Sequence, residues 1–119
     1  MICPQPLSVR VALERALERL GLEAGLIEQL NDEVRLATSF EIDELSPVPW
    51  AGSVTVPTLL YQVREDVYTH PSDVQAVYDQ IPAEKDLFWI DGTTRRWDGY
   101  TYFQREPARV LAWLKRFMS

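Results

Sequence analysis

Hydrophobic positions along the chain fall into blocks with different periods. Val54–Val63 and Asp86–Asp91 each contain consecutive apolar residues, which is typical of strands buried on both faces, as in a parallel sheet. Between them, apolar residues recur at helical spacing from Pro71, a residue that favours a helix start, to Pro82, which ends the pattern. The sequence therefore predicts a β-α-β unit with two parallel strands.

Helical periodicity also precedes and follows this unit. Ser8 is a suitable N-cap for a helix over 9–20, and Gly21 suits the position just past its end. A second apolar stripe predicts a helix over 23–38, and a wide apolar face predicts a last helix from Pro107. Each of these faces requires a surface to cover.

Length and composition fit one domain. The chain has 119 residues, of which 46% are hydrophobic and 25% charged, as in ordinary globular proteins. We expect a single domain over 1–119, with a helical region at 7–45 and a β-α-β-α unit at 46–119. The predicted fold class is α/β, a small parallel βαβ core flanked by helices.

Charge and cysteine content narrow the function classes. The net charge of −6 disfavours nucleic acid and anionic membrane surfaces by repulsion. Cys3 is the sole cysteine, and no cluster of Cys and His has metal-ligand spacing, so we expect neither a metal nor another cofactor. Because no apolar run approaches bilayer length and Glu14 and Glu18 interrupt the N-terminal segment, the expected compartment is the cytoplasm.

The order of motifs resembles the last third of an α/β-hydrolase domain. The residues that carry the resemblance are PTLLYQVRED at 57–66, a helix after His70-Pro71, LFWIDGTTRRWDGY at 87–100 and the aromatic C-terminal helix. The resemblance implies that Asp66 occupies the position of the triad acid. It also implies that Met1–Pro4 is the end of a preceding strand and that 7–45 is the helical excursion after it.

The chain also departs from the hydrolase pattern. It contains no Gly-x-Ser-x-Gly nucleophile elbow, and Arg95 stands at or next to the position where the resemblance implies the triad histidine. Arginine keeps its proton up to a pKa above about 12 and is no general base near neutral pH. These departures favour a non-catalytic protein.

Several side chains are candidates for a site. Asp66 is interpreted either as a surviving catalytic acid or, preferably, as a loop residue that caps or pairs with Arg64, Arg95 or Arg96. His70, the single histidine, is interpreted as a turn or capping residue at a helix start rather than as a base. The ligand-binding candidates are Arg95, Arg96, Trp97 and Tyr100.

The resemblance covers only part of a hydrolase sheet, and this affects the expected oligomeric state. A strand over Val54–Val63 without a neighbour on one side would leave backbone groups and apolar side chains bare. We therefore expect a homodimer through this edge, with 1–6, 50–63 and parts of the first two helices in the contact.

Two functions remain open from the sequence. The first is a truncated, non-catalytic α/β-hydrolase-like module that self-associates and has an interaction or small-ligand role. The alternative is an esterase-like hydrolase whose active site is completed by another chain, with Asp66 as the triad-type acid. A third hypothesis is that the working protein begins upstream of Met1.

Overall fold

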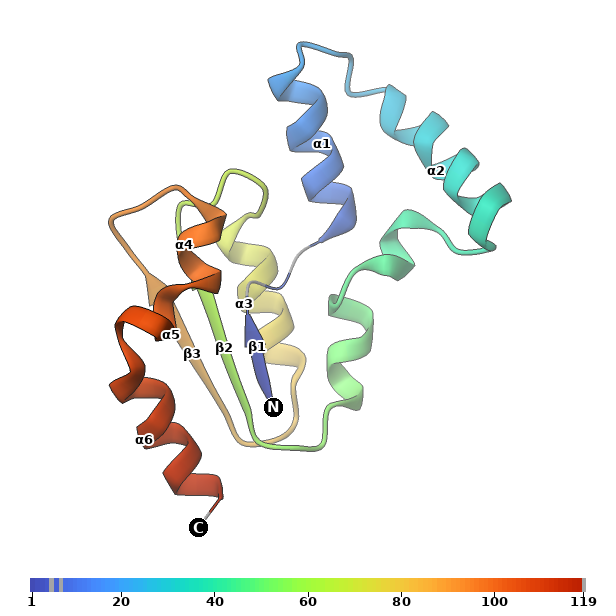
Figure 1. Cartoon of the computed structure of the whole chain (residues 1–119). Helices are drawn as coiled ribbons and strands as arrows, with labels where there is room; N and C mark the ends of the chain where they lie inside the picture. Colours follow the sequence, from blue (N-terminus) through green and yellow to red (C-terminus); the bar gives the residue numbers. More distant parts are fainter. Residues whose placement is uncertain (5, 7, 119) are drawn as a thin grey trace.

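The computed structural model describes residues 1–4, 6 and 8–118, and in this part of the chain three parallel strands form one open sheet in the order β1-β2-β3 (Figure 1). Residues 5, 7 and 119, which fall at the predicted start of the helical region and at the C-terminus, lie outside the described residues. The predicted α/β class is confirmed. The strands are β1 (Ile2–Pro4), β2 (Thr58–Val63) and β3 (Lys85–Ile90).

Strand β2 lies in the middle of the sheet, and all six of its residues are buried. This confirms the prediction from its continuous apolar run. The strand begins at Thr58 rather than at Val54, because Pro57 lacks an N–H for the ladder and the preceding residues form a 3₁₀ helix. Strand β3 is only partly buried, since it lies at an edge of the sheet, so its predicted burial on both faces is wrong.

Helices cover both faces of the sheet. On one face, α3 (Pro71–Gln80) packs Val77 and Ile81 against Leu60. On the other face, Tyr61 and its neighbours pack against aromatic side chains of the C-terminal helices. These helices are α4 (Arg96–Tyr100), α5 (Tyr102–Arg105) and α6 (Pro107–Phe117). The first two form the segment between β3 and α6.

A helical lobe made of α1 (Val9–Arg19), α2 (Leu26–Thr38) and η1 (Ile42–Leu45) stands away from the sheet (Figure 1). The lobe has its own buried cluster of Leu17, Ile27 and Ile42. The predicted caps of α1 are confirmed: the Ser8 hydroxyl accepts the N–H of Val11, and Gly21 has a φ of 69° directly after the helix. Helix α2 starts three residues later than predicted, with Gly25 at its N-cap.

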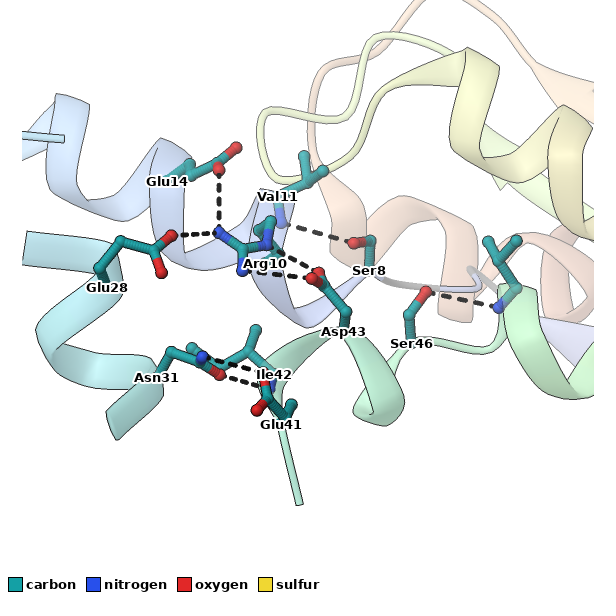
Figure 2. Close-up of polar contacts among 11 residues, drawn as sticks. Ser8, Arg10, Val11, Glu14, Glu28, Asn31, Glu41, Ile42, Asp43 and Ser46 are labelled. Carbon is teal, nitrogen blue, oxygen red and sulfur yellow. Dashed lines mark hydrogen bonds and ion pairs between the residues drawn. The ribbon is translucent and has the colours of Figure 1, made fainter. Parts of the chain in front are cut away.

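The guanidinium of Arg10 joins the three elements of the lobe. It donates to both carboxylate oxygens of Asp43, at 2.7 and 3.2 Å, and to Glu28 at 3.1 Å (Figure 2). These hydrogen bonds, first with Asp43 and then with Glu28, raise the pKa of Arg10. Beside this contact, the buried side chain of Asn31 accepts the N–H of Ile42 and donates to Glu41. The lobe is therefore held by a polar connection as well as by its small core.

The connector between lobe and sheet is a second 3₁₀ helix, η2 (Val48–Ser53). Its Ala51 is buried against the α3 side of the core, whereas Trp50 is 58% exposed and donates its indole N–H to the carbonyl of Glu44. Trp50 therefore lies on the outside, because the small Ala51 takes the inward position of this turn.

The edge of β2 that the sequence suggested to be bare is covered in part by β1, which pairs with Leu59–Tyr61. The N-terminal segment thus returns to the sheet. Among the described residues, β1 forms the free edge on this side of the sheet, and β3 forms the other edge. This edge spans three residues and ends at a proline, which has no N–H. Short strands and proline are features that weaken strand addition at an edge.

Candidate functional site

Asp66 lies directly after β2, in the turn that ends the strand. Its N–H donates to the carbonyl of Val63, and the following loop leads to Pro71 at the start of α3. The N–H of Arg64 meanwhile donates to the carbonyl of Ile90 at the end of β3. The loops after β2 and β3 are therefore neighbours, as expected for parallel strands. Asp66 is 3% exposed, so its carboxylate is withdrawn from solvent.

Three groups bind the Asp66 carboxylate. Nη1 of Arg96 lies 2.5 Å from Oδ2, and Nε2 of Gln62 donates to the same oxygen at 3.1 Å. The N–H of Tyr68 donates to Oδ1 at 2.8 Å. The Arg96 side chain is 17% exposed and that of Asp66 fully buried. A buried charge of this kind is tolerated because it is both paired and hydrogen-bonded.

Gln62 is a site residue that sequence reasoning missed. It is 1% exposed, and its Nε2 also lies 3.1 Å from the carbonyl of Val63 and from Oγ1 of the buried Thr69. The available signal was an amide inside an otherwise apolar central strand, because a buried polar side chain requires partners. Gln62 thus connects the strand to both ends of the Asp66 loop.

Arg96 reaches Asp66 from the first residue of α4. Its Nε donates to the hydroxyl of Tyr100 at 3.1 Å, and its guanidinium lies 5.5 Å from the centre of that ring. Of the two arginines in this loop, Arg96 is therefore the one that contacts Asp66. Arg95 precedes the helix and is exposed, and its N–H donates to the Thr93 hydroxyl.

Of the remaining ligand candidates, Tyr100 contacts this pair through Arg96. Trp97 is 65% exposed and Tyr100 is 44% exposed, and their rings lie 5.9 Å apart in an edge-on arrangement. A groove with a volume of about 740 Å³ lies elsewhere, between β3 and α6. Phe88 and Trp113 form its apolar walls, and Arg109 lies over the Phe88 ring.

His70 and Cys3 occupy separate surroundings. His70 stands at the N-cap of α3, but its ring makes no capping bond; its Nδ1 instead lies 2.6 Å from Nη2 of Arg15. His70 therefore lies at the helix start, as expected, and contributes its backbone carbonyl, which accepts the N–H of Asp73, rather than a side-chain cap. Cys3 packs against Leu60 and α3, and burial raises the pKa of its thiol. The structure brings neither residue to Asp66.

Two kinds of feature are absent from the described ranges 1–4, 6 and 8–118. Within them, no group of three His, Cys, Asp or Glu side chains is arranged to hold a metal ion. Nor does this part of the chain contain a helix of the length and apolarity needed to span a bilayer.

Comparison with known proteins identifies a solved structure with a similar fold. No protein-family model and no curated protein matches the chain. A solved esterase from Pyrococcus furiosus superposes with a TM-score of 0.57 at 18% identity, covering 96% of this chain and 43% of the esterase. The chain therefore spans less than half the length of that esterase. At this identity the likeness concerns the fold, and it supports the resemblance to part of a hydrolase.

Proposed function

We propose that this chain is a non-catalytic, α/β-hydrolase-like module that self-associates and has an interaction or small-ligand role. The observation that carries the proposal is the ion pair between Asp66 and Arg96. Asp66 stands where the resemblance implies a triad acid, and the group against its carboxylate is a guanidinium.

The chemistry of this pair supports a structural role. A triad acid accepts a hydrogen bond from histidine and so orients the imidazole that moves a proton. Arg96 has no proton to give or take near neutral pH, because its pKa lies above about 12. A histidine supplied by another chain would have to displace Arg96 from Asp66, leaving a largely buried guanidinium without its carboxylate, which is costly.

The alternative is an esterase-like hydrolase whose site is completed by another chain, with Asp66 as its acid. It is favoured by the position of Asp66 at the carboxyl end of β2 and by the likeness to part of an esterase. A small-ligand role without catalysis would instead use the exposed side chains of α4, namely Arg95, Trp97 and Tyr100.

Hydrolysis of p-nitrophenyl acetate separates the two candidates. We expect the purified chain to release nitrophenol no faster than an equal concentration of its Asp91→Asn variant, which changes an exposed carboxylate after β3. The Asp66→Asn variant is expected to match both. Turnover by the unmodified chain that persists in Asp91→Asn and disappears in a folded Asp66→Asn variant would establish the esterase-like alternative.

A further inference from the structure

The two ends of the molecule carry opposite charge. Residues 20–46, which include α2 and η1, contain seven acidic side chains and one basic side chain. Residues 92–118, which include α4 to α6, contain six basic and two acidic side chains. Figure 1 places α2 and α6 at opposite ends of the molecule, whose longest extent is 49 Å. The chain is therefore an elongated body with an acidic lobe and a basic end.

Among the described residues, some of these charged side chains have no oppositely charged partner. In the lobe, Glu23 and Glu33 have no basic side chain within 4.0 Å among the described residues. At the other end, within the same described ranges, Arg109 and Lys115 have no acidic side chain at that distance, whereas Arg116 pairs with Glu84. Unpaired acids and bases at opposite ends favour contact between molecules.

The basic end also carries an open apolar groove of about 400 Å³. Residues beside the free sheet edge form one wall of the groove, and α6 forms the other. Leu111 and Leu114 of α6 and Met118, directly after the helix, follow one another at spacings of three and four. They therefore lie along one stripe, and Lys115 borders it. The wall-forming residues are Met1, Ile2 and Pro57 from the sheet side and Leu114, Phe117 and Met118 from α6.

Helix α2 has an exposed surface of matching kind. Its inward side buries Ile27 and Asn31. Its outer side carries Leu36, which is 80% exposed, and Leu30, which is 37% exposed, with Glu33 between them. This surface is apolar with an unpaired acid, and the groove is apolar with an unpaired base. The two are complementary.

The overall shape leaves room for a second molecule at the groove. The radius of gyration is 16.0 Å, whereas a compact domain of this length has one of about 13.5 Å. The lobe therefore extends beyond the body of its own chain. In a two-fold pair of such bodies lying antiparallel, the lobe of each copy meets the basic end of the other, so the contact is made twice.

From these observations we infer that a second copy of this chain occupies the groove, with α2 of each copy packed against α6 of its partner. The inference deepens the self-association in the proposed function and rests on it. The inferred dimer still has its contact near the sheet edge, as expected from the sequence. The contact is made by side chains of α2 and α6, however, and not by pairing of strands from the two copies. Because acid faces base at both contacts, the net charge of −6 does not oppose the assembly.

Sedimentation velocity of the full chain tests the charge pairing. We expect a dimer that weakens with added sodium chloride, and we expect Glu33→Lys and Lys115→Glu each to raise the dimer dissociation constant about tenfold, since each change acts at two contacts. The double variant is expected to recover most of the affinity, because it restores opposite charges. Both residues are exposed, so the fold is retained. A matched control is Glu65→Lys, which reverses an exposed acid outside the lobe.

Disulfide cross-linking tests the geometry. In a Cys3→Ala background, Leu36→Cys and Leu111→Cys on separate molecules are expected to form an intermolecular disulfide when mixed and oxidised, and Leu36→Cys alone is not. A dimer that forms no such disulfide and ignores both charge reversals overturns the α2–α6 contact and leaves self-association intact. A monomer at all micromolar concentrations overturns both, whereas the ester assay separately decides the catalytic question.

Discussion

Asp66 and Arg96 are thirty positions apart in the sequence, yet Oδ2 and Nη1 are 2.5 Å apart at the ends of two neighbouring strands. The pair links the loop after β2 to the first turn of α4. Because the Asp66 side chain is fully buried and that of Arg96 is 17% exposed, water screens the interaction little. Removal of either side chain leaves the charge of the other largely buried without its ion-pair partner.

We expect Arg96→Leu to lower the free energy of unfolding by about 3 kcal/mol, as is typical when one member of a buried ion pair is lost. Urea unfolding followed by tryptophan fluorescence measures this change. The control is Arg64→Leu, which removes a 2.7 Å pair between Arg64 and Asp91 whose side chains are 45% and 67% exposed. The free energy of unfolding of Arg64→Leu is expected to fall by less than about 1 kcal/mol.

A double variant tests whether Arg96 and Asp66 stabilise the fold as a pair. Combining Arg96→Leu with Asp66→Asn removes both charges together, so the combined loss of stability is expected to be smaller than the sum of the two single losses. Additive losses, or equal effects at Arg96 and Arg64, would show that the pair does not hold the two loops together.

Local sequence signals predicted much of the fold. The run TLLYQV identified a strand buried on both faces, and residues such as Ser8, Gly21 and Pro107 marked helix ends, because their backbone preferences act over a few residues. The place of Met1–Pro4 as a strand came from the resemblance. Its pairing with Leu59–Tyr61 depends on contacts more than fifty residues apart, which no local pattern specifies.

The candidate site was predicted only in part, because its geometry also depends on more than local sequence signals. The sequence indicated Asp66 at a strand end and an arginine beside it, but the choice between Arg95 and Arg96 depends on the helical turn that begins at Arg96. That turn lies in a segment without clear periodicity. Gln62 was overlooked because the strand was interpreted by its apolar residues alone, although its amide binds the Asp66 carboxylate.

The helical lobe is expected to open independently of the sheet. Its cluster of Leu17, Ile27 and Ile42 is separate from the cluster around Leu60, and Arg10 ties its three elements together. We expect Arg10→Met to increase amide hydrogen exchange in α1, α2 and η1 by about tenfold or more while β2 and β3 keep their protection. Exchange measured by mass spectrometry resolves these segments.

The control for this experiment is Arg35→Met. Arg35 pairs with Asp32 at 3.3 Å within α2 and with Glu41, just before η1, at 3.9 Å. All three side chains are more than half exposed, so water screens both pairs and their loss is expected to have little effect. The exchange pattern of Arg35→Met is expected to match that of the unmodified chain. A uniform rise in exchange through β2 in Arg10→Met would instead mean that lobe and sheet unfold as one unit.

Stability is expected to fall at alkaline pH through Cys3. Burial raises the pKa of its thiol above the ordinary value of 9.0, so the unfolded chain loses this proton first as the pH rises. The stabilising contribution is therefore complete below about pH 9 and is lost as the pH rises through the folded-state pKa. Burial, with smaller effects of Cys3 and Tyr100, likewise raises the pKa of Tyr61, which extends the decline above its ordinary value of 10.0.

Urea unfolding at a series of pH values from neutral to mildly alkaline measures this decline. The Cys3→Ala variant is expected to lose less stability over the range around the ordinary thiol pKa, because it has no proton to release there. Alkylation by iodoacetamide near neutral pH is expected to be slower for the folded chain than for the chain in urea, since the thiolate is the reactive form and burial disfavours it. Identical pH profiles for the two proteins, together with equally fast alkylation of the folded chain, would contradict a buried Cys3 and the packing of β1 against α3.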